Sequence, residues 1–377
     1  MTYKIVNPGK LTWIRRADTI LDKIFPKSNT SPLPIAAPKN ILVVRLAYIG
    51  DAILTQPVFK VIREAYPQAR IDFLTGVHCK PLFQQDPAID RVIAWDAPWF
   101  YKTDLRSGIG KWLKIVKLLR KENYDLAIDF RGDLRNIGLI LWAAGIPVRV
   151  SYDSGGGRRL LTHPVKWVET KHKALFHLDI LKAIGLKVWE SPIPKISVHG
   201  PTRVLLKQEL EFRGIQEGKF IVIHPGSRLP LKQWPIEKYV KLAQKILEKS
   251  IQVIVIGSSE EKDLASTIAN QSGSICFAGG YDLTEVAAIL SLAKLAITND
   301  SAPMHLSAAV GTPVIGIFGP SNPEETAPLG YGSRAVSIPM ECRKNCYESQ
   351  CTNPSGPVCI RDISVDAVLE AMEDLHS

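Results

Sequence analysis

The chain has 377 residues, 46% of them hydrophobic, which is enough for two domains with a core each. No apolar run approaches the roughly 20 residues that cross a bilayer, and the N-terminus lacks the pattern of a secretory signal, so we expect a globular, cytoplasmic protein. The formal net charge of +10 at pH 7 indicates an anionic partner.

Residues 1–39 are predicted to be a basic amphipathic extension that ends in a Pro-rich tether. Apolar residues recur at helical spacing and basic residues lie among them: Leu11, Ile14, Ala17, Leu21, Ile24 and Phe25, with Trp13, Arg15, Arg16 and Lys23. Such a helix either lies on an anionic membrane surface or packs its apolar stripe on the protein itself. Nucleic acid is not expected as a partner, because no RNA-binding signature, finger spacing or basic repeat is present.

Residues 40–198 are predicted to form a first α/β domain. Strands are expected at residues 40–46, 70–76, 91–95, 125–130 and 148–152, alternating with helices at 52–65, 109–122 and 136–144. Asp51 then stands at the carboxyl end of the first strand, the edge where open α/β sheets bind ligands. Two basic stretches, 154–159 and 166–177, read as an acceptor-facing loop or as merely solvated chain.

Residues 199–377 are predicted to form a second domain with the same alternation of strands and helices, after a Pro-containing linker at 191–194. Strands are expected at 219–224, 252–256, 275–277, 294–298 and 314–318, and helices at 202–213, 239–248, 262–270 and 283–293. Both domains are therefore predicted to be α/β domains with open sheets.

A phosphate-binding site is predicted where the strand at 294–298 meets the next helix. Asp300 occupies the expected N-cap position, the backbone N–H groups of Ser301 and Ala302 lie at the positive end of the helix dipole, and His305 can donate a further hydrogen bond. An ordinary capped helix remains the alternative.

Four of the six cysteines cluster at the C-terminal end, at Cys342, Cys346, Cys351 and Cys359. Four thiols within 18 residues could hold a structural zinc, and a cytoplasmic location argues against disulfides. The spacing lacks the usual two-residue knuckle, however, so no metal is assigned to the predicted site.

Three motifs resemble glycosyltransferase family 9, the lipopolysaccharide heptosyltransferases, over about residues 40–363. They are residues 49–57 (IGDAILTQP), residues 224–228 with 232–235 (HPGSR and KQWP), and residues 299–305 (NDSAPMH). Three motifs in the family's order are more specific than one glycine-rich loop.

The resemblance implies a GT-B architecture, with two Rossmann-like doubly wound domains facing a cleft, the acceptor on the first and the nucleotide sugar on the second. It also implies an inverting, metal-independent glycosyltransferase without a cofactor. Heptose would pass from ADP-heptose to a lipid-linked core oligosaccharide in lipopolysaccharide biosynthesis. The enzyme would be cytoplasmic, either free or peripheral on the inner face of the cytoplasmic membrane.

Within that scheme Asp51 is the candidate general base on the acceptor hydroxyl, and Lys232 the candidate cation for the departing diphosphate. The remaining donor-binding candidates are Ser227, Arg228, Glu261, Asp300, Ser301, Ala302 and His305. Glu261, or its neighbour Glu260, follows a strand in the Rossmann position that usually contacts ribose hydroxyls, and Glu261 is the preferred candidate.

Some residues depart from the commoner family pattern, and they lie near the donor site. Ala302 stands where glycine is frequent, and Ser227 with Arg228 occupies positions that can be two threonines. Alternatives therefore include a related transferase with another nucleotide sugar or acceptor, and less readily a sugar-nucleotide 2-epimerase of the same two-domain frame. A sugar-phosphate binding protein without turnover, or a dehydrogenase, fits the motifs less well.

Overall fold

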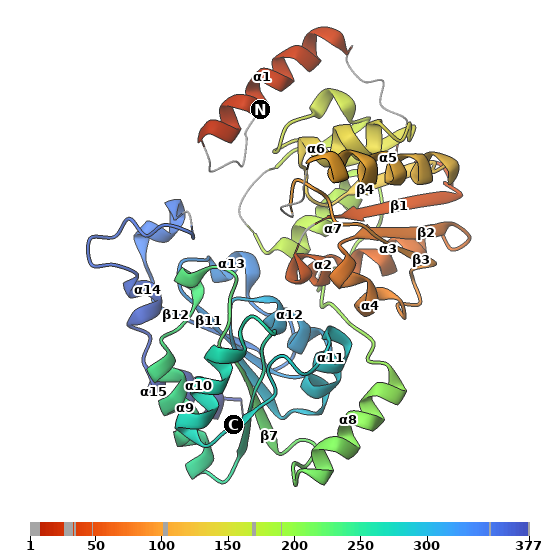
Figure 1. Ribbon diagram of the computed structural model, residues 1–377. Coiled ribbons are helices and arrows are strands. Elements are labelled where there is room, and N and C mark those ends of the chain that lie inside the picture. The colour runs from red at the N-terminus through yellow and green to blue at the C-terminus, as the bar shows by residue number, and fades with distance from the viewer. Residues whose placement is uncertain are drawn as a thin grey trace. The chain divides into compact units, whose positions relative to one another are not determined.

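Two parallel six-stranded sheets form the cores of the protein (Figure 1). The computed structural model describes residues 8–25, 33, 35–46, 48–100, 105–167, 171–189, 191–346 and 348–375. The chain divides into two units, Met1–Pro192 and Ile193–Ser377, so the division falls inside the Pro-containing segment 191–194. Among the described residues, no helix is long and apolar enough to cross a bilayer.

The sheet of the first unit has the strand order β3-β2-β1-β4-β5-β6, with every pairing parallel. Its strands are β1 Asn40–Arg45, β2 Arg70–Thr75, β3 Arg91–Ala94, β4 Leu126–Asp129, β5 Val148–Tyr152 and β6 His163–Val165. The central strands β1 and β4 are apolar and buried almost throughout, as expected where helices cover both faces of a parallel sheet.

Helices cover both faces of this sheet. They are α1 Pro8–Ile24, α2 Ile49–Thr55, α3 Pro57–Ala65, α4 Lys80–Phe83, α5 Leu105–Lys121, α6 Leu134–Asn136, which continues as a π-helical segment Ile137–Trp142, and α7 Lys173–Ala183. On one face, α5 and the π-helical segment pack on β1 and β4. On the other, Phe59, Phe73 and Phe83 join α3, β2 and α4 edge to face.

The helix predicted at residues 52–65 is two helices. α2 ends at Thr55 and α3 begins at Pro57, because proline has no N–H to continue the helical hydrogen bonds. The basic stretch predicted as a loop at 166–177 is also corrected, since α7 begins at Lys173.

α1 packs on its own unit, which is the second of the two interpretations of the amphipathic extension. Ile14, with Ala17, Leu21 and Phe25, contacts an apolar cluster that contains Leu134, Ile137, Leu160 and Leu161. The glycine-rich stretch 154–159 supports this contact instead of forming a solvated loop. Buried Asp18 accepts a hydrogen bond from the N–H of Gly157 at 2.7 Å, and a Cβ on Gly156 would lie 2.5 Å from Ile14.

The second unit repeats the strand order of the first, as β12-β11-β10-β7-β8-β9, again all parallel. Its strands are β7 Phe220–His224, β8 Gln252–Val255, β9 Ile275–Cys276, β10 Leu295–Asn299, β11 Val314–Phe318 and β12 Arg334–Ser337. Its helices are α8 Gly200–Phe212, α9 Ile236–Glu248, α10 Lys262–Ser272, α11 Leu283–Leu292, α12 Ala302–Ala309, α13 Pro323–Thr326, α14 Val358–Arg361 and α15 Val365–Glu373.

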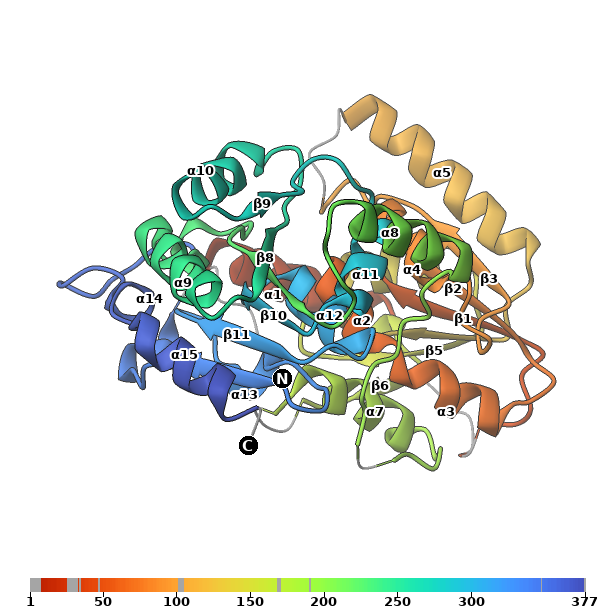
Figure 2. The same ribbon diagram turned by 90° about the horizontal axis from the view of Figure 1, so that it is seen from below.

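The helices of the second unit form one layer on each side of its sheet (Figures 1 and 2). α9, α10 and α15 bury their apolar faces against alternate residues of β7, β8, β10 and β11. α12 covers the opposite face, where Met304 fills the space beside Gly316, and α8 packs on α11. The two Rossmann-like domains expected from the sequence are confirmed.

Candidate functional site

Each sheet has one topological switch point, where the strand order reverses. In the first unit it lies between β1 and β4, and in the second between β7 and β10. Ligands of doubly wound sheets bind at the carboxyl ends of the strands at this point. Asp51 follows β1, the segment with Ser227, Arg228 and Lys232 follows β7, and Asp300 to His305 follow β10. The strand order therefore brings these predicted residues of each unit to one edge of its sheet.

Lys232 lies at the centre of a charged group in the second unit. It ends a 3-10 turn, Pro230–Lys232, and its Nζ lies 2.8 Å from Oδ2 of Asp300 and 2.9 Å from Oε2 of Glu348. Burial alone would lower the pKa of Lys232, but the two carboxylates outweigh it and raise the pKa. Burial likewise opposes the ionisation of Asp300, yet Lys232 holds the pKa of Asp300 below its ordinary value. Both groups are therefore charged at neutral pH.

The prediction that Asp300 is the N-cap of the following helix is wrong. The N-cap of α12 is Ser301, and the Asp300 carboxylate is turned to Lys232 instead of to the helix. The Ser301 side chain makes no capping bond, because its hydroxyl contacts His224 and the carbonyl oxygen of Asn299. The backbone N–H groups of Ser301 and Ala302 have no acceptor among the described residues, so the dipole end of α12 is open to an anion. His305 is buried on this helix, one turn further on.

Glu261 is the N-cap residue of α10, and its carboxylate turns back toward β7. Its Oε2 accepts a hydrogen bond from the N–H of Ser258 at 2.9 Å and lies 3.3 Å from Nε2 of His224. The hydrogen bond with His224 lowers the pKa of Glu261 to about 2. A Cβ on Gly226 would lie 1.8 Å from Oε1 of Glu261, so a side chain at residue 226 would displace this carboxylate from His224.

His224 and Asn299 organise this edge, although the sequence analysis did not select them as site residues. His224 is buried at the end of β7, and its Nδ1 lies 3.2 Å from Oγ of Ser301, so it links Ser301 to Glu261. Asn299 Nδ2 donates to the carbonyl oxygen of Pro225 at 2.6 Å. His224 and Asn299 are the first residues of two of the quoted motifs, so the motifs could have identified both as site residues.

Ser227 and Arg228 lie on the loop after β7. The carbonyl oxygen of Ser227 accepts a hydrogen bond from Nε2 of Gln233 at 2.8 Å, which fixes the loop beside Lys232. The Ser227 side chain is partly exposed and Arg228 is exposed, so both can reach a ligand at this edge.

In the first unit Asp51 lies in the first turn of α2 and is surrounded by basic groups. Its Oδ1 lies 2.8 Å from Nη2 of Arg45 and 3.6 Å from Nζ of Lys173. The N-cap of α2 is Tyr48, so Asp51 is not the capping residue of this helix. Arg45 also donates to the carbonyl oxygen of Phe130, which ties the first strand to the end of β4.

Charge, not burial, decides the ionisation of Asp51. Burial would raise its pKa, but the positive charges of Lys173, Arg45 and Arg131 together hold the pKa far below its ordinary value. Burial lowers the pKa of nearby His177 to about 3, so this imidazole is neutral at pH 7. Asp51 is thus a permanent anion that can accept a proton only weakly while all three cations are close.

The basic partners of Asp51 were not among the predicted site residues. Arg45 ends β1 and Arg131 follows β4, so the rule for carboxyl ends of strands could have selected both. Lys173 and His177 could not be selected in that way, because their stretch reads as a loop and only the fold places α7 beside α2.

A family model for Glycosyltransferase family 9 (heptosyltransferase) matches residues 112–355. The chain belongs to glycosyltransferase family 9. It is therefore a glycosyltransferase, as predicted.

Three known proteins illustrate the relationship. Lipopolysaccharide heptosyltransferase 2 of Escherichia coli (strain K12) is 26% identical over 320 residues, which are 79% of this chain and 88% of that protein. A solved glycosyl transferase family 9 protein from Veillonella parvula gives a TM-score of 0.76 at 23% identity and covers 92% of this chain and 99% of its own. The E. coli heptosyltransferase WaaC, solved with ADP-2-deoxy-2-fluoro heptose, gives 0.68 at 18% identity, with 89% and 99% covered. The GT-B fold is confirmed.

Proposed function

We propose that the protein transfers heptose from ADP-heptose, with inversion, to a lipid-linked core oligosaccharide of lipopolysaccharide. The observation that carries the proposal is the Lys232–Asp300 pair beside the open end of α12, at the switch point of a family 9 chain. Relatives named lipopolysaccharide heptosyltransferases, and a neighbour solved with an ADP-heptose analogue, support the choice of donor.

The second unit would hold the donor. Lys232 and the N–H groups of Ser301 and Ala302 face the diphosphate, with Ser227, Arg228 and His305 as further donors, and Glu261 accepts hydrogen bonds from the ribose. The diphosphate must replace Glu348 on Lys232, because Glu348 lies there without it. These groups would stabilise the negative charge that grows on the leaving ADP without a metal ion.

Asp51 of the first unit would be the general base. The acceptor hydroxyl oxygen attacks the anomeric carbon, the bond from that carbon to the ADP oxygen breaks, and Asp51 takes the hydroxyl proton. Its basicity rises when Lys173, the more exposed of the two cations that contact it, turns away. Arg45 is buried and would keep the carboxylate in place.

A panel of nucleotide sugars tests the donor assignment. Transfer and donor hydrolysis would be measured with ADP-heptose, ADP-glucose, UDP-glucose and GDP-mannose, each with extracted lipopolysaccharide core acceptors. We expect turnover with ADP-heptose alone. Turnover with another donor, and none with ADP-heptose on any acceptor, would refute the assignment while leaving the family membership intact.

We further propose that the outer face of α1 lies on an anionic membrane surface, on the cytoplasmic side, where a lipid-linked acceptor would be found. The inner face of α1 is used in packing, but Trp13, Ile20 and Ile24 are 55%, 57% and 64% exposed, and Arg15, Arg16 and Lys23 are exposed between them. Half-exposed Trp142 continues this apolar surface through its contact with Phe25. Aromatic and aliphatic side chains interleaved with basic ones are typical of interfacial helices.

Vesicle sedimentation tests this surface. We expect Trp13→Ser with Ile20→Ser to lower binding to anionic phosphatidylglycerol vesicles about tenfold or more, because two inserted apolar side chains are lost. The control is Leu205→Ser with Phe212→Ser, two exposed residues of α8 that belong to the other unit. Equal sedimentation of both variants and the unaltered protein would contradict the proposal.

A further inference from the structure

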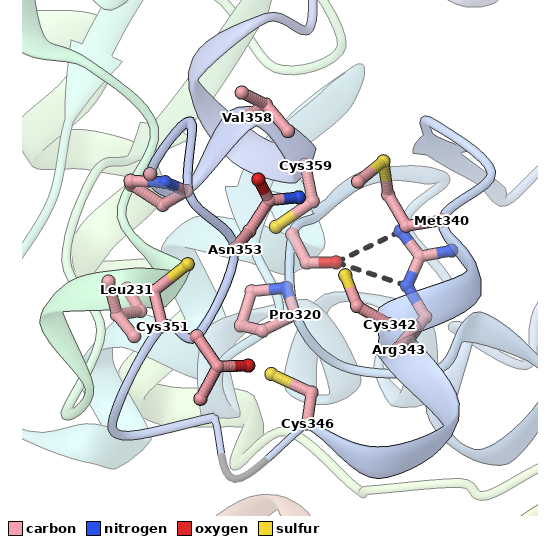
Figure 3. A pocket seen from close by; sticks show the side chains of 14 residues that line it. Leu231, Pro320, Met340, Cys342, Arg343, Cys346, Cys351, Asn353, Val358 and Cys359 are labelled. Atoms are coloured by element: carbon pink, nitrogen blue, oxygen red, sulfur yellow. Dashed lines mark hydrogen bonds between the residues drawn. The ribbon is translucent and has the colours of Figure 1, made fainter.

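One pocket of the second unit is lined by all four clustered cysteines (Figure 3). Cys342 lies in the 3-10 helix Glu341–Asn345, Cys346 follows it, Cys351 lies in the next loop and Cys359 lies in α14. All four are free thiols, and their sulfur atoms are turned inward around Pro320. We call this set of four the four-thiol pocket.

The segment that carries these thiols has no core of its own. Of its described residues from 339 to 359, none is fully buried, and its longest helix has five residues. The segment is fixed at one side by Arg343, which donates to the carbonyl oxygens of Gly319 and Ile338 at 2.9 and 2.8 Å. At the other side Ile360 enters the main core. A stretch that buries so little apolar surface needs another source of order, and a metal centre or a disulfide is the usual one.

The chemistry of the pocket favours a metal. Four thiolates would repel one another unless a cation lay between them. The backbone N–H of Glu348 points to Sγ of Cys346 at 3.4 Å, a contact that stabilises a thiolate ligand. The carboxylate of Glu348 is paired with Lys232, so the ligands left for a metal in this pocket are the four cysteine sulfur atoms.

We propose that the four-thiol pocket binds one thiophilic divalent cation, Zn²⁺ or Fe²⁺, through Cys342, Cys346, Cys351 and Cys359. Soft thiolate ligands select these ions over Mg²⁺ or Ca²⁺. Among the described residues, no three ligating side chains are yet close enough together to share an ion, so binding must draw the thiols inward. Each thiol releases its proton to water as the metal–sulfur bond forms.

This site goes beyond glycosyl transfer, and its effect on the donor site would be structural. Glu348 lies between two of the cysteines and pairs with Lys232, and Leu231, the residue before Lys232, also lines the pocket. A bound metal would hold residues 348–351 in one arrangement, and with them the Glu348 carboxylate that the donor has to displace. The metal would take no part in the chemistry of transfer.

Metal analysis of the full chain tests the proposal. The protein would be purified without chelator from medium that contains zinc and iron, and its metals measured by inductively coupled plasma mass spectrometry. We expect about one equivalent of zinc plus iron. Metal-free protein titrated with Co²⁺ should show the visible absorption of tetrahedral cobalt and the near-ultraviolet charge transfer of cobalt thiolate.

Matched variants show whether the cluster is the source of the metal. Cys351→Ser and Cys359→Ser should each weaken Co²⁺ binding by about tenfold or more, whereas Cys276→Ser, a half-buried thiol outside the cluster, should leave it unchanged. Less than about a tenth of an equivalent of metal together with no cobalt thiolate absorption would overturn the proposal. So would cluster disulfides found by thiol counting, or unchanged Co²⁺ binding in both cluster variants. If a cluster variant fails to fold, the Co²⁺ spectrum of the unaltered protein decides alone.

Discussion

At the scale of single residues, ionisation is decided by neighbours that are distant in sequence. Asp51 could be selected from the sequence because it follows the first strand, and Lys232 because it lies in a motif. Their charge environments could not be predicted. Lys173 is 122 residues from Asp51, and Glu348 is 116 residues from Lys232, so only the folded chain brings each pair together.

Lys173 should control the pH dependence of the reaction. Removing its positive charge raises the pKa of Asp51, since Lys173 is the first of the cations that lower it. Asp51 must be deprotonated to act as a base, so in Lys173→Met the acid limb of the kcat/KM profile should move to higher pH. Lys182→Met, an exposed residue of the same helix, is the control. An acid limb that stays in place, or that moves equally in the control, would show that Lys173 does not tune Asp51.

At the scale of elements, the hydrophobic periodicity of the sequence predicted where helices and strands lie, but it did not predict where each element ends. The residue pattern predicted a helix after β1 and missed its interruption before Pro57, although proline was visible there. The N-cap of α12 was assigned one residue early, because Asp300 suits a cap by type and its pairing with Lys232 is tertiary. The amphipathic pattern predicted α1 but not which surface its apolar stripe contacts.

The docking of α1 should depend on Asp18 far more than on Asp22. Asp18 is buried and accepts the hydrogen bond of the Gly157 N–H, so Asp18→Ala leaves a buried donor unpaired, at a cost of about 1–3 kcal/mol. Asp22 pairs with Arg159 at the surface, and Asp22→Ala should cost less than about 1 kcal/mol.

Hydrogen exchange measures this difference directly. Amide protection in α1 should fall in Asp18→Ala and stay close to that of the unaltered protein in Asp22→Ala. Equal protection in the two variants would mean that α1 is not held by this contact.

At the scale of the whole molecule, the sequence was most informative. Two runs of alternating strands and helices predicted two α/β domains, and the family resemblance predicted that both are Rossmann-like. Both sheets have the same strand order. That order places each motif at a switch point, which is why motif spacing identified the candidate sites. The basic partners of Asp51 and the role of Glu348 could be identified only from the folded structure, because their segments carry no sequence motif that indicates a site.

We propose that the second unit binds the donor while Asp51 of the first unit activates the acceptor. This division of roles is tested on the variants Asp51→Asn and Lys232→Met. For each variant, the kinetics of transfer from ADP-heptose and the donor Kd, by calorimetric titration, would be measured. Thermal unfolding checks that both variants are folded. Asp51→Asn should lower kcat by about 10² to 10⁴-fold with the donor Kd nearly unchanged, whereas Lys232→Met should weaken donor binding and lower kcat together. Equal effects of the two substitutions on donor Kd and on kcat would contradict the account.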